Sequence, residues 1–93
     1  MIDTGGTICQ GAKLLRRRGA SRVLCCATHA VFSPPSIERL SEPGLFEEVV
    51  VTNSIPVPPD RMFDQLRVLS VANMLGEAIW RIHEESSVSS MFR

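Results

Sequence analysis

The spacing of apolar residues changes along the chain between the period of a helix and the short continuous runs of buried strands. Helical spacing, or a proline pair that can open a helix, predicts helices over residues 7–18, 34–40 and 71–83. Short apolar runs of β-type character predict strands over residues 22–27, 47–52 and 66–69. A proline-rich loop separates the last two strands at residues 53–64. Helices and strands therefore alternate through most of the chain.

The first and last predicted helices each have an apolar face and recognisable ends. Gly19 follows the first helix as a typical C-terminal stop, and Ser70 is the expected cap of the last helix. The apolar face of the first helix consists of Ile8, Ala12, Leu14 and Leu15. The last helix places Leu75, Ile79 and Ile82 on one face. Beyond the last helix, from Glu84, we expect a polar tail.

This alternation predicts an α/β fold, in which a partial parallel sheet of Rossmann-like type has flanking helices. A chain of 93 residues is one domain at most, and it is short for a layered α/β fold. A glycine-rich loop before a helix normally follows a strand, whereas here the chain begins inside the loop. We therefore expect residues 1–93 to be the C-terminal part of a longer domain whose first strands are absent.

Composition narrows the classes of partner. The chain is 44% hydrophobic and 22% charged, with ten basic and ten acidic residues, a net charge of zero and a pI near 6.7. A neutral chain has no global field that would draw it to nucleic acid or to an anionic membrane, so neither is expected as a partner. The basic run at residues 16–18 is short and is expected to complement a helix dipole. No apolar segment approaches the ~18–20 residues that cross a bilayer.

The three cysteines do not indicate a disulfide or zinc site. Cys25 and Cys26 are adjacent in a predicted strand, where successive side chains face opposite sides, and Cys9 is distant in sequence. We expect all three to be buried free thiols in a reducing compartment.

The segment with the clearest chemistry is the loop Asp3-Thr4-Gly5-Gly6-Thr7, which precedes a helix expected to start near Ile8. Free N–H groups at a helix N-terminus, two glycines and two threonine hydroxyls form a cradle for a phosphate group. Asp3 would repel phosphate unless it points towards sugar hydroxyls or a metal, which favours a phosphorylated polyol as ligand. Since the same residues favour a tight turn with a helix cap, these five residues alone leave both interpretations open.

The flanking sequence resembles a known family. Residues 1–7 are similar to the second half of the phosphoribosyl pyrophosphate-binding motif, which in full has an apolar strand and two acidic residues before this loop. Three later blocks resemble segments of ribose-phosphate diphosphokinases, also called phosphoribosyl pyrophosphate synthetases. These blocks are Thr-His-Ala-Val-Phe-Ser at 28–33, Val-Thr-Asn-Ser-Ile-Pro at 51–56 and Ser-Val-Ser-Ser-Met-Phe at 87–92.

The resemblance implies a phosphoribosyltransferase-like domain of an enzyme with two such domains per subunit and dimers assembled into hexamers. It implies transfer of diphosphate from ATP to ribose 5-phosphate, with magnesium as cofactor, in the cytoplasm or an organelle. Asp3, Thr4, Gly5, Gly6 and Thr7 would hold the 5-phosphate. The family's tail contributes to a regulatory site between subunits, which implies that role for Ser87, Ser89 and Phe92.

The chain also departs from the family pattern. The acidic pair, the N-terminal domain and the mobile basic loop of the family are absent from these residues, so most magnesium ligands lie elsewhere and no catalytic residue is assigned. Ala30 replaces a glycine found in many members. We expect the isolated chain to be inactive and prone to aggregation, with a disordered serine-rich tail.

Several alternatives stay open. His29 could act as a general base, although a structural loop histidine bonded to backbone is favoured. Asn53 and Ser54 could line the site or form a turn, and Trp80 is expected in packing or an interface. A non-catalytic protein that binds full-length synthetase subunits is the main alternative function, and a purine or pyrimidine phosphoribosyltransferase is a more distant one.

Overall fold

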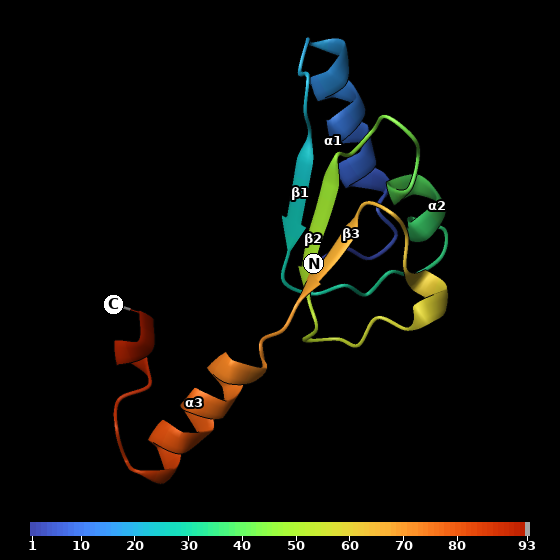
Figure 1. The fold of residues 1–93 in the computed structure, drawn as a ribbon. Coiled ribbons are helices and arrows are strands. Elements are labelled where there is room, and N and C mark those ends of the chain that lie inside the picture. Colours follow the sequence, from blue (N-terminus) through green and yellow to red (C-terminus); the bar gives the residue numbers. More distant parts are fainter. Residues whose placement is uncertain (93) are drawn as a thin grey trace.

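The computed structural model describes residues 1–92 and contains the predicted alternation of helices and strands (Figure 1). The elements are α1 (Gly6–Arg17), β1 (Leu24–Ala27), α2 (Ser36–Leu40), β2 (Glu48–Thr52), η1 (Pro59–Arg61), β3 (Leu66–Leu69), α3 (Ala72–His83) and η2 (Ser89–Phe92). The two η elements are short 3-10 helices. The predicted α/β class is confirmed, and β3 has the predicted bounds.

The three strands form one parallel sheet in the order β1-β2-β3. Val49 in the central strand pairs with Cys25 on one side and with Leu66 on the other. Because the strands are parallel, their carboxyl ends meet at one edge of the sheet, which is the edge where open α/β folds bind ligands.

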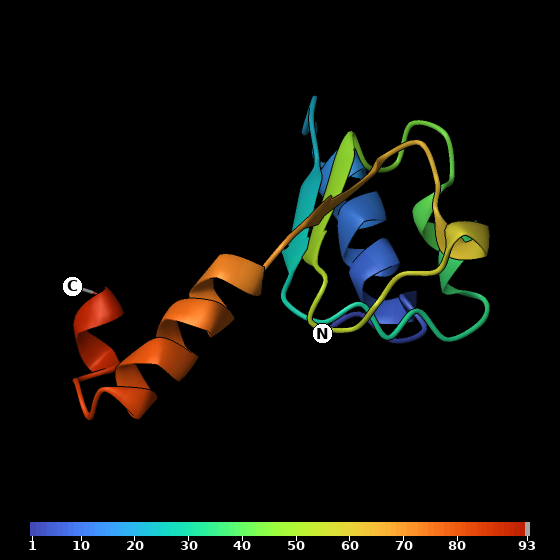
Figure 2. The same cartoon turned by 60° about the horizontal axis from the view of Figure 1, so that its bottom comes forward.

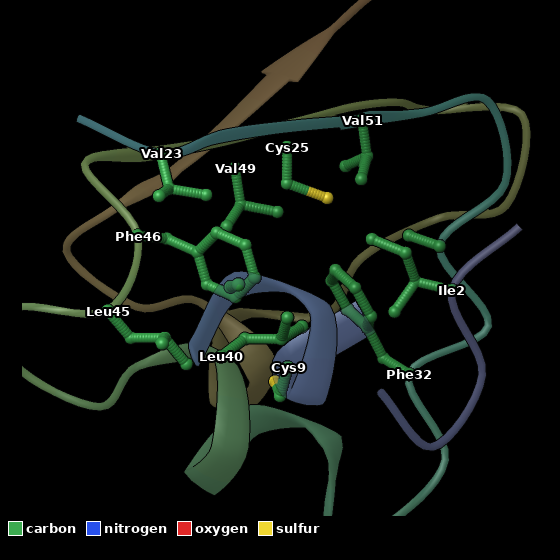
Figure 3. Packing of buried hydrophobic residues seen from close by; sticks show 12 residues of the cluster. Ile2, Cys9, Val23, Cys25, Phe32, Leu40, Leu45, Phe46, Val49 and Val51 are labelled. Carbon is green, nitrogen blue, oxygen red and sulfur yellow. The ribbon is translucent and has the colours of Figure 1, made fainter. Parts of the chain in front are cut away.

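The two faces of the sheet differ in their cover. On one face, which α1 and α2 cover (Figure 2), the side chains of Cys25, Val49 and Val51 are buried (Figure 3). On the opposite face, Leu24 and Leu69 remain 53% and 51% exposed. Within residues 1–92, no helix covers that second face, so the chain forms two layers.

The core lies between the covered face of the sheet and the two helices (Figure 3). Its buried members are Ile2, Cys9, Ala12, Val23, Cys25, Ala30, Phe32, Leu40, Leu45, Phe46, Val49 and Val51. The first residues of the chain join this core through Ile2, which is only 3% exposed. The loop that follows Ile2 is therefore anchored at its start.

Two sequence predictions about burial were wrong. Leu14 and Leu15 were expected on the packed face of α1, but they are 46% and 53% exposed, and Cys9 and Ala12 are the buried residues of that helix. Cys26 was expected to be buried, but it is exposed because it faces the uncovered side of the sheet. All three cysteines are free, as predicted.

Helix α3 extends away from the sheet (Figures 1 and 2) and has no buried residue. Its predicted apolar face is exposed, with Leu75 at 54% and both Ile79 and Ile82 at 67%. The helix begins at Ala72 with Val71 as its N-cap residue, one position later than predicted, and the predicted cap Ser70 lies before it with its hydroxyl accepting from the Ala72 N–H at 3.1 Å.

Candidate functional site

The loop at residues 3–7 leaves the sheet at its carboxyl edge. Ile2 forms an isolated parallel bridge with Ala30, which follows the end of β1. The Ile2 N–H donates to the His29 carbonyl at 2.9 Å, and the Ile2 carbonyl accepts from the Val31 N–H at 2.9 Å. These bonds continue the sheet by one residue and place the loop where ligands of open α/β folds bind.

The loop turns into α1 at Gly5, which has φ 78° and is the N-cap residue. This left-handed backbone is readily adopted by glycine and disfavoured for residues with a Cβ. Helix α1 starts at Gly6, not near Ile8 as predicted, so Gly6 and Thr7 form its first turn. The loop is consequently shorter than the sequence indicated, and its last two residues present helical amides.

The N-terminus of α1 keeps its hydrogen-bond donors free. The first amide bonded to a carbonyl in this turn is that of Cys9, which donates to the Gly5 carbonyl at 3.0 Å. The N–H groups of Gly6, Thr7 and Ile8 have no acceptor within residues 1–92, and no side chain caps the helix. Free amides at the positive end of a helix dipole favour an anion. The structure therefore shows a tight turn at Gly5 without a side-chain cap, and the phosphate cradle stays a prediction.

Residues 1–8 line an open hollow of about 430 Å³. Asp3, Thr4 and Thr7 are exposed around it, while Gly5 is buried. The five residues predicted as a phosphate cradle therefore lie together, with side-chain and backbone donors at the same hollow. Its size lies within the range of small-molecule sites.

Residues of helix α2 contact the loop at residues 3–7. A Cβ on Gly5 would lie 3.8 Å from atoms of Ser36 and Leu40, both of which are 0% exposed. The Arg39 guanidinium reaches the loop itself, since its Nη1 donates to the Thr4 carbonyl at 3.2 Å. The sequence analysis did not predict a role for Arg39. The pattern of residues around Arg39 cannot indicate a contact with Thr4, which lies 35 positions earlier in the chain.

A second polar cluster lies at the carboxyl ends of β1 and β2. The Ser54 hydroxyl is 3.0 Å from the Thr28 carbonyl and 2.7 Å from His29 Nδ1. Because the carbonyl can only accept, the Ser54 proton goes to Thr28, and we assign a proton to His29 Nδ1, which then donates to Ser54. The predicted structural role of His29 fits this bond, although its partner is a side chain rather than the backbone.

Asn53 joins this edge to the start of α3. Its N–H donates to the Leu69 carbonyl at 3.0 Å, and its side-chain oxygen accepts from the Val71 N–H at 2.9 Å. Of the two roles considered for Asn53, the structure favours the structural one: it clamps the connection between β3 and α3.

The buried thiols are poor nucleophiles. Burial raises the pKa of Cys25 to about 11, and burial likewise raises the pKa of Cys9, partly offset by Lys13 and Arg39. Both are therefore protonated at neutral pH, and only thiolates are strongly nucleophilic. These cysteines act as core residues.

The predicted regulatory residues lie apart from the loop, at the far end of α3 (Figure 1). The tail was expected to be disordered, but Ser89–Phe92 form a 3-10 helix. Arg81 holds it by donating to the Ser87 carbonyl at 3.1 Å and to the Ser90 hydroxyl. Ser87, Ser89 and Phe92 are exposed, and within residues 1–92 they form no site with Asp3–Thr7.

The His, Cys, Asp and Glu side chains of residues 1–92 do not form a metal site. Within the described residues, no group of three or more His, Cys, Asp and Glu side chains could hold a metal ion, and Asp3 is the single carboxylate of the loop. None of the helices described in residues 1–92 is long and apolar enough to cross a membrane.

Comparisons with known proteins agree with this geometry. Residues 1–93 match the family model for the phosphoribosyl synthetase-associated domain. The chain is 80% identical to the ribose-phosphate pyrophosphokinase of Parasynechococcus marenigrum and 71% identical to that of Gloeobacter violaceus. Each match covers 100% of this chain and 28% of the relative, so the chain spans 28% of the length of these curated relatives.

A solved structure gives the same result. The crystal structure of phosphoribosylpyrophosphate synthetase from Mycobacterium smegmatis matches with a TM-score of 0.89 at 46% identity, covering 92% of this chain and 28% of that one. The family resemblance carried by the loop and the three later blocks is confirmed. The chain therefore belongs to the phosphoribosyl synthetase-associated domain family, and the relatives compared with it are ribose-phosphate pyrophosphokinases.

Proposed function

We propose that this chain holds the phosphate of ribose 5-phosphate in a transferase that makes phosphoribosyl pyrophosphate from ribose 5-phosphate and ATP. The observation that carries the proposal is the set of free amides at Gly6, Thr7 and Ile8, next to the left-handed Gly5. The names of the relatives support the activity. Residues 1–93 would then belong to one phosphoribosyltransferase-like domain of that enzyme.

The loop can bind a phosphate monoester through its backbone. Three free N–H groups at the positive end of α1 can donate to phosphate oxygens, and the exposed Thr4 and Thr7 hydroxyls can add further bonds. Asp3 is exposed at the start of the loop, where its carboxylate can accept from sugar hydroxyls. Phosphate and sugar would thus meet different ends of one loop.

In the proposed reaction, the 1-hydroxyl oxygen of the sugar attacks the β-phosphorus of ATP. One phosphorus–oxygen bond forms, the bond between that phosphorus and the oxygen of the α-phosphate breaks, AMP leaves, and the hydroxyl proton is released. Such transfers depend on positioning and charge stabilisation. The chain's contribution is positioning: a phosphate fixed on α1 sets the place of the sugar.

Magnesium stays a prediction for the whole enzyme. Asp3 is the one carboxylate of the loop, and residues 1–92 contain no group of three or more His, Cys, Asp and Glu side chains that could hold a metal ion, so no step is assigned to the metal here. We also propose a cytoplasmic location and a homo-oligomeric enzyme, and a regulatory role for Ser87, Ser89 and Phe92 once subunits assemble.

Isothermal titration of ribose 5-phosphate into the 93-residue chain tests the proposal, with unphosphorylated ribose as the control ligand. We expect saturable binding of the phosphate ester and none of ribose. Thr7→Ala should weaken binding about 10-fold through a lost hydrogen bond to a charged group, and Thr7→Ser should restore it. Ser21→Ala removes an exposed hydroxyl that precedes β1, at the opposite end of the sheet, and should have no effect. A folded chain that binds neither ligand, or both equally, contradicts the proposal.

A second candidate function is docking to full-length synthetase subunits without catalysis. The exposed apolar face of α3 favours it, because Leu75, Ile79 and Ile82 are 54%, 67% and 67% exposed and follow the helical spacing that places them on one side. Co-elution with a full-length ribose-phosphate pyrophosphokinase in size-exclusion chromatography would support this function. Ile79→Ser should abolish co-elution, whereas Leu15→Ser, which changes an exposed leucine on α1, should not. No co-elution of the unmodified chain rules it out.

A further inference from the structure

We propose that Arg39 is a positioning residue for the phosphate loop: from α2 it fixes the peptide between Thr4 and Gly5 and thereby orients a donor of the cradle. This inference rests on the proposed function for its ligand, but its structural part can be tested without any ligand. It adds a residue that lies outside the loop and that belongs to none of the four blocks of family resemblance.

The first observation is the hydrogen bond between Arg39 Nη1 and the Thr4 carbonyl, at 3.2 Å. A peptide group is planar and trans, so its carbonyl and the following N–H point in opposite directions. A Thr4 carbonyl directed at Arg39 consequently turns the Gly5 N–H away from the guanidinium. That amide has no acceptor within residues 1–92, so it is available to a ligand together with the three amides of α1.

The second observation concerns Gly6. A Cβ on Gly6 would lie 3.0 Å from Arg39 Nη1, the same nitrogen that contacts Thr4, and no other side chain is closer than Arg39. Gly6 also lies in the first turn of α1 and has no positive φ, so its backbone would accept alanine. Glycine at position 6 is therefore explained by the space that the Arg39 guanidinium needs, because the backbone there has no conformation that would require glycine.

The third observation is that Arg39 has no ion-pair partner among the described residues. It forms no ion pair among the described residues, although Glu38 and Glu42 line the same hollow of about 540 Å³ between α1 and α2. Glu42 instead pairs with Lys13 at 3.8 Å. An arginine has five N–H donors, and the Thr4 carbonyl occupies one of them. Arg39 therefore brings to the Thr4 carbonyl a positive charge that forms no ion pair within residues 1–92.

These observations make a specific prediction about coupling. Alanine at Gly6 must displace the tip of Arg39 by a few tenths of an ångström, which disturbs the bond to Thr4. If Arg39 is already alanine, Gly6→Ala meets nothing and should be silent. The two substitutions should therefore be non-additive, as expected for residues that act on one contact.

The test uses the 93-residue chain with four variants: Arg39→Ala, Gly6→Ala, the double variant, and Arg17→Ala as a matched arginine control. Arg17 is exposed at the other end of α1 and makes no side-chain bond among residues 1–92. We expect Arg39→Ala to weaken ribose 5-phosphate binding about 10-fold, since a charged hydrogen bond is lost, and Arg17→Ala to leave it unchanged. Gly6→Ala should weaken binding alone but not in the Arg39→Ala background. Equal effects of Gly6→Ala in both backgrounds would overturn the proposal.

NMR relaxation of the ligand-free chain separates this inference from the proposed function. Arg39→Ala should lower the backbone order parameters of Gly5 and Gly6 from about 0.85 towards 0.6, and Arg17→Ala should not. Arg39→Lys, which keeps a donor and the charge, should restore part of the order. If the unmodified chain binds no ribose 5-phosphate but Arg39→Ala still loosens the loop, the proposed function fails and the positioning role stands. Unchanged order parameters in Arg39→Ala overturn the positioning role.

Discussion

Helices α1 and α3 have the same length and opposite surroundings. Each has 12 residues and an apolar face, but α1 buries Cys9 and Ala12 against the sheet, whereas α3 buries no residue at all. An apolar face requires a partner and does not identify it. In α1 the partner is the adjacent sheet. In α3 the described residues provide none, so its apolar face stays exposed and it adds nothing to this core.

The largest expected effect separates the core from α3. Leu40→Ala should lower the free energy of unfolding by about 2–5 kcal/mol, because Leu40 is 0% exposed and packs under the loop. Ile79→Ala should change it by less than about 0.5 kcal/mol, since Ile79 is 67% exposed. Urea denaturation followed by far-UV circular dichroism measures both. A large loss in Ile79→Ala would mean that α3 packs against the sheet or a second copy in solution.

A matched pair of glycines sharpens the comparison. Gly5→Ala should destabilise the chain by about 1–2 kcal/mol, because Gly5 has φ 78° and alanine resists the left-handed region. Gly76→Ala should stabilise it by up to about 1 kcal/mol, because Gly76 lies inside α3 with nothing near its Cβ position. Thermal unfolding of the two variants should thus shift in opposite directions. A shift in the same direction would contradict the assigned backbone of one of them.

Thiol chemistry tests the two faces of the sheet. In the folded chain, Cys26 should react quickly with an aromatic disulfide reagent, and Cys9 and Cys25 only after unfolding. Because burial raises the pKa of Cys25 from 9.0 to about 11, its contribution to stability is full below pH 9 and is lost as pH rises towards 11. Cys25→Ala should remove that part of the pH dependence above pH 9. Equal reactivity of Cys25 and Cys26 would mean that reagent reaches the face of the sheet that α1 and α2 cover.

The smallest effect is spectroscopic. Trp80 is the one tryptophan in the sequence and is 59% exposed on α3, so the emission of the chain should resemble that of tryptophan in water and be quenched by acrylamide. Ribose 5-phosphate should not change it, because the loop and α3 are separate (Figure 1). Emission at shorter wavelength that returns to the water value on dilution would show that α3 is covered by another copy.

The parts predictable from sequence are those decided by neighbours along the chain. The apolar run Val49-Val50-Val51 identified β2, and Leu66–Leu69 was placed residue by residue. The five loop residues were selected by local chemistry and by the resemblance of their flanks, because glycines and hydroxyls before a helix suit either a phosphate cradle or a tight turn. The structure places them around one hollow, and their role in binding phosphate stays a prediction.

The parts that failed depend on contacts between distant segments. Leu14 and Leu15 follow the helical period, but the sheet meets α1 along the side of Cys9 and Ala12. Cys26 looks as apolar as Cys25, and only the absence of a second layer in residues 1–92 exposes it. Arg39 was missed because its partner, Thr4, lies 35 positions earlier. None of these features leaves a pattern in the adjacent sequence.

Asn53 fixes the point at which α3 leaves the sheet, so a small rotation there moves the far end of the helix by a larger distance. The same residue bonds the Leu69 carbonyl and the Val71 N–H, so it sets the direction in which the helix leaves the sheet. A helix of 12 residues is about 18 Å long, and a rotation of about 10° at its base moves its tip by about 3 Å. Asn53 is adjacent to Ser54, which bonds His29 at the ligand edge. Because Asn53 bonds both Leu69 and Val71, a change in the direction of α3 would have to displace the backbone next to Ser54 and His29, at the carboxyl ends of β1 and β2.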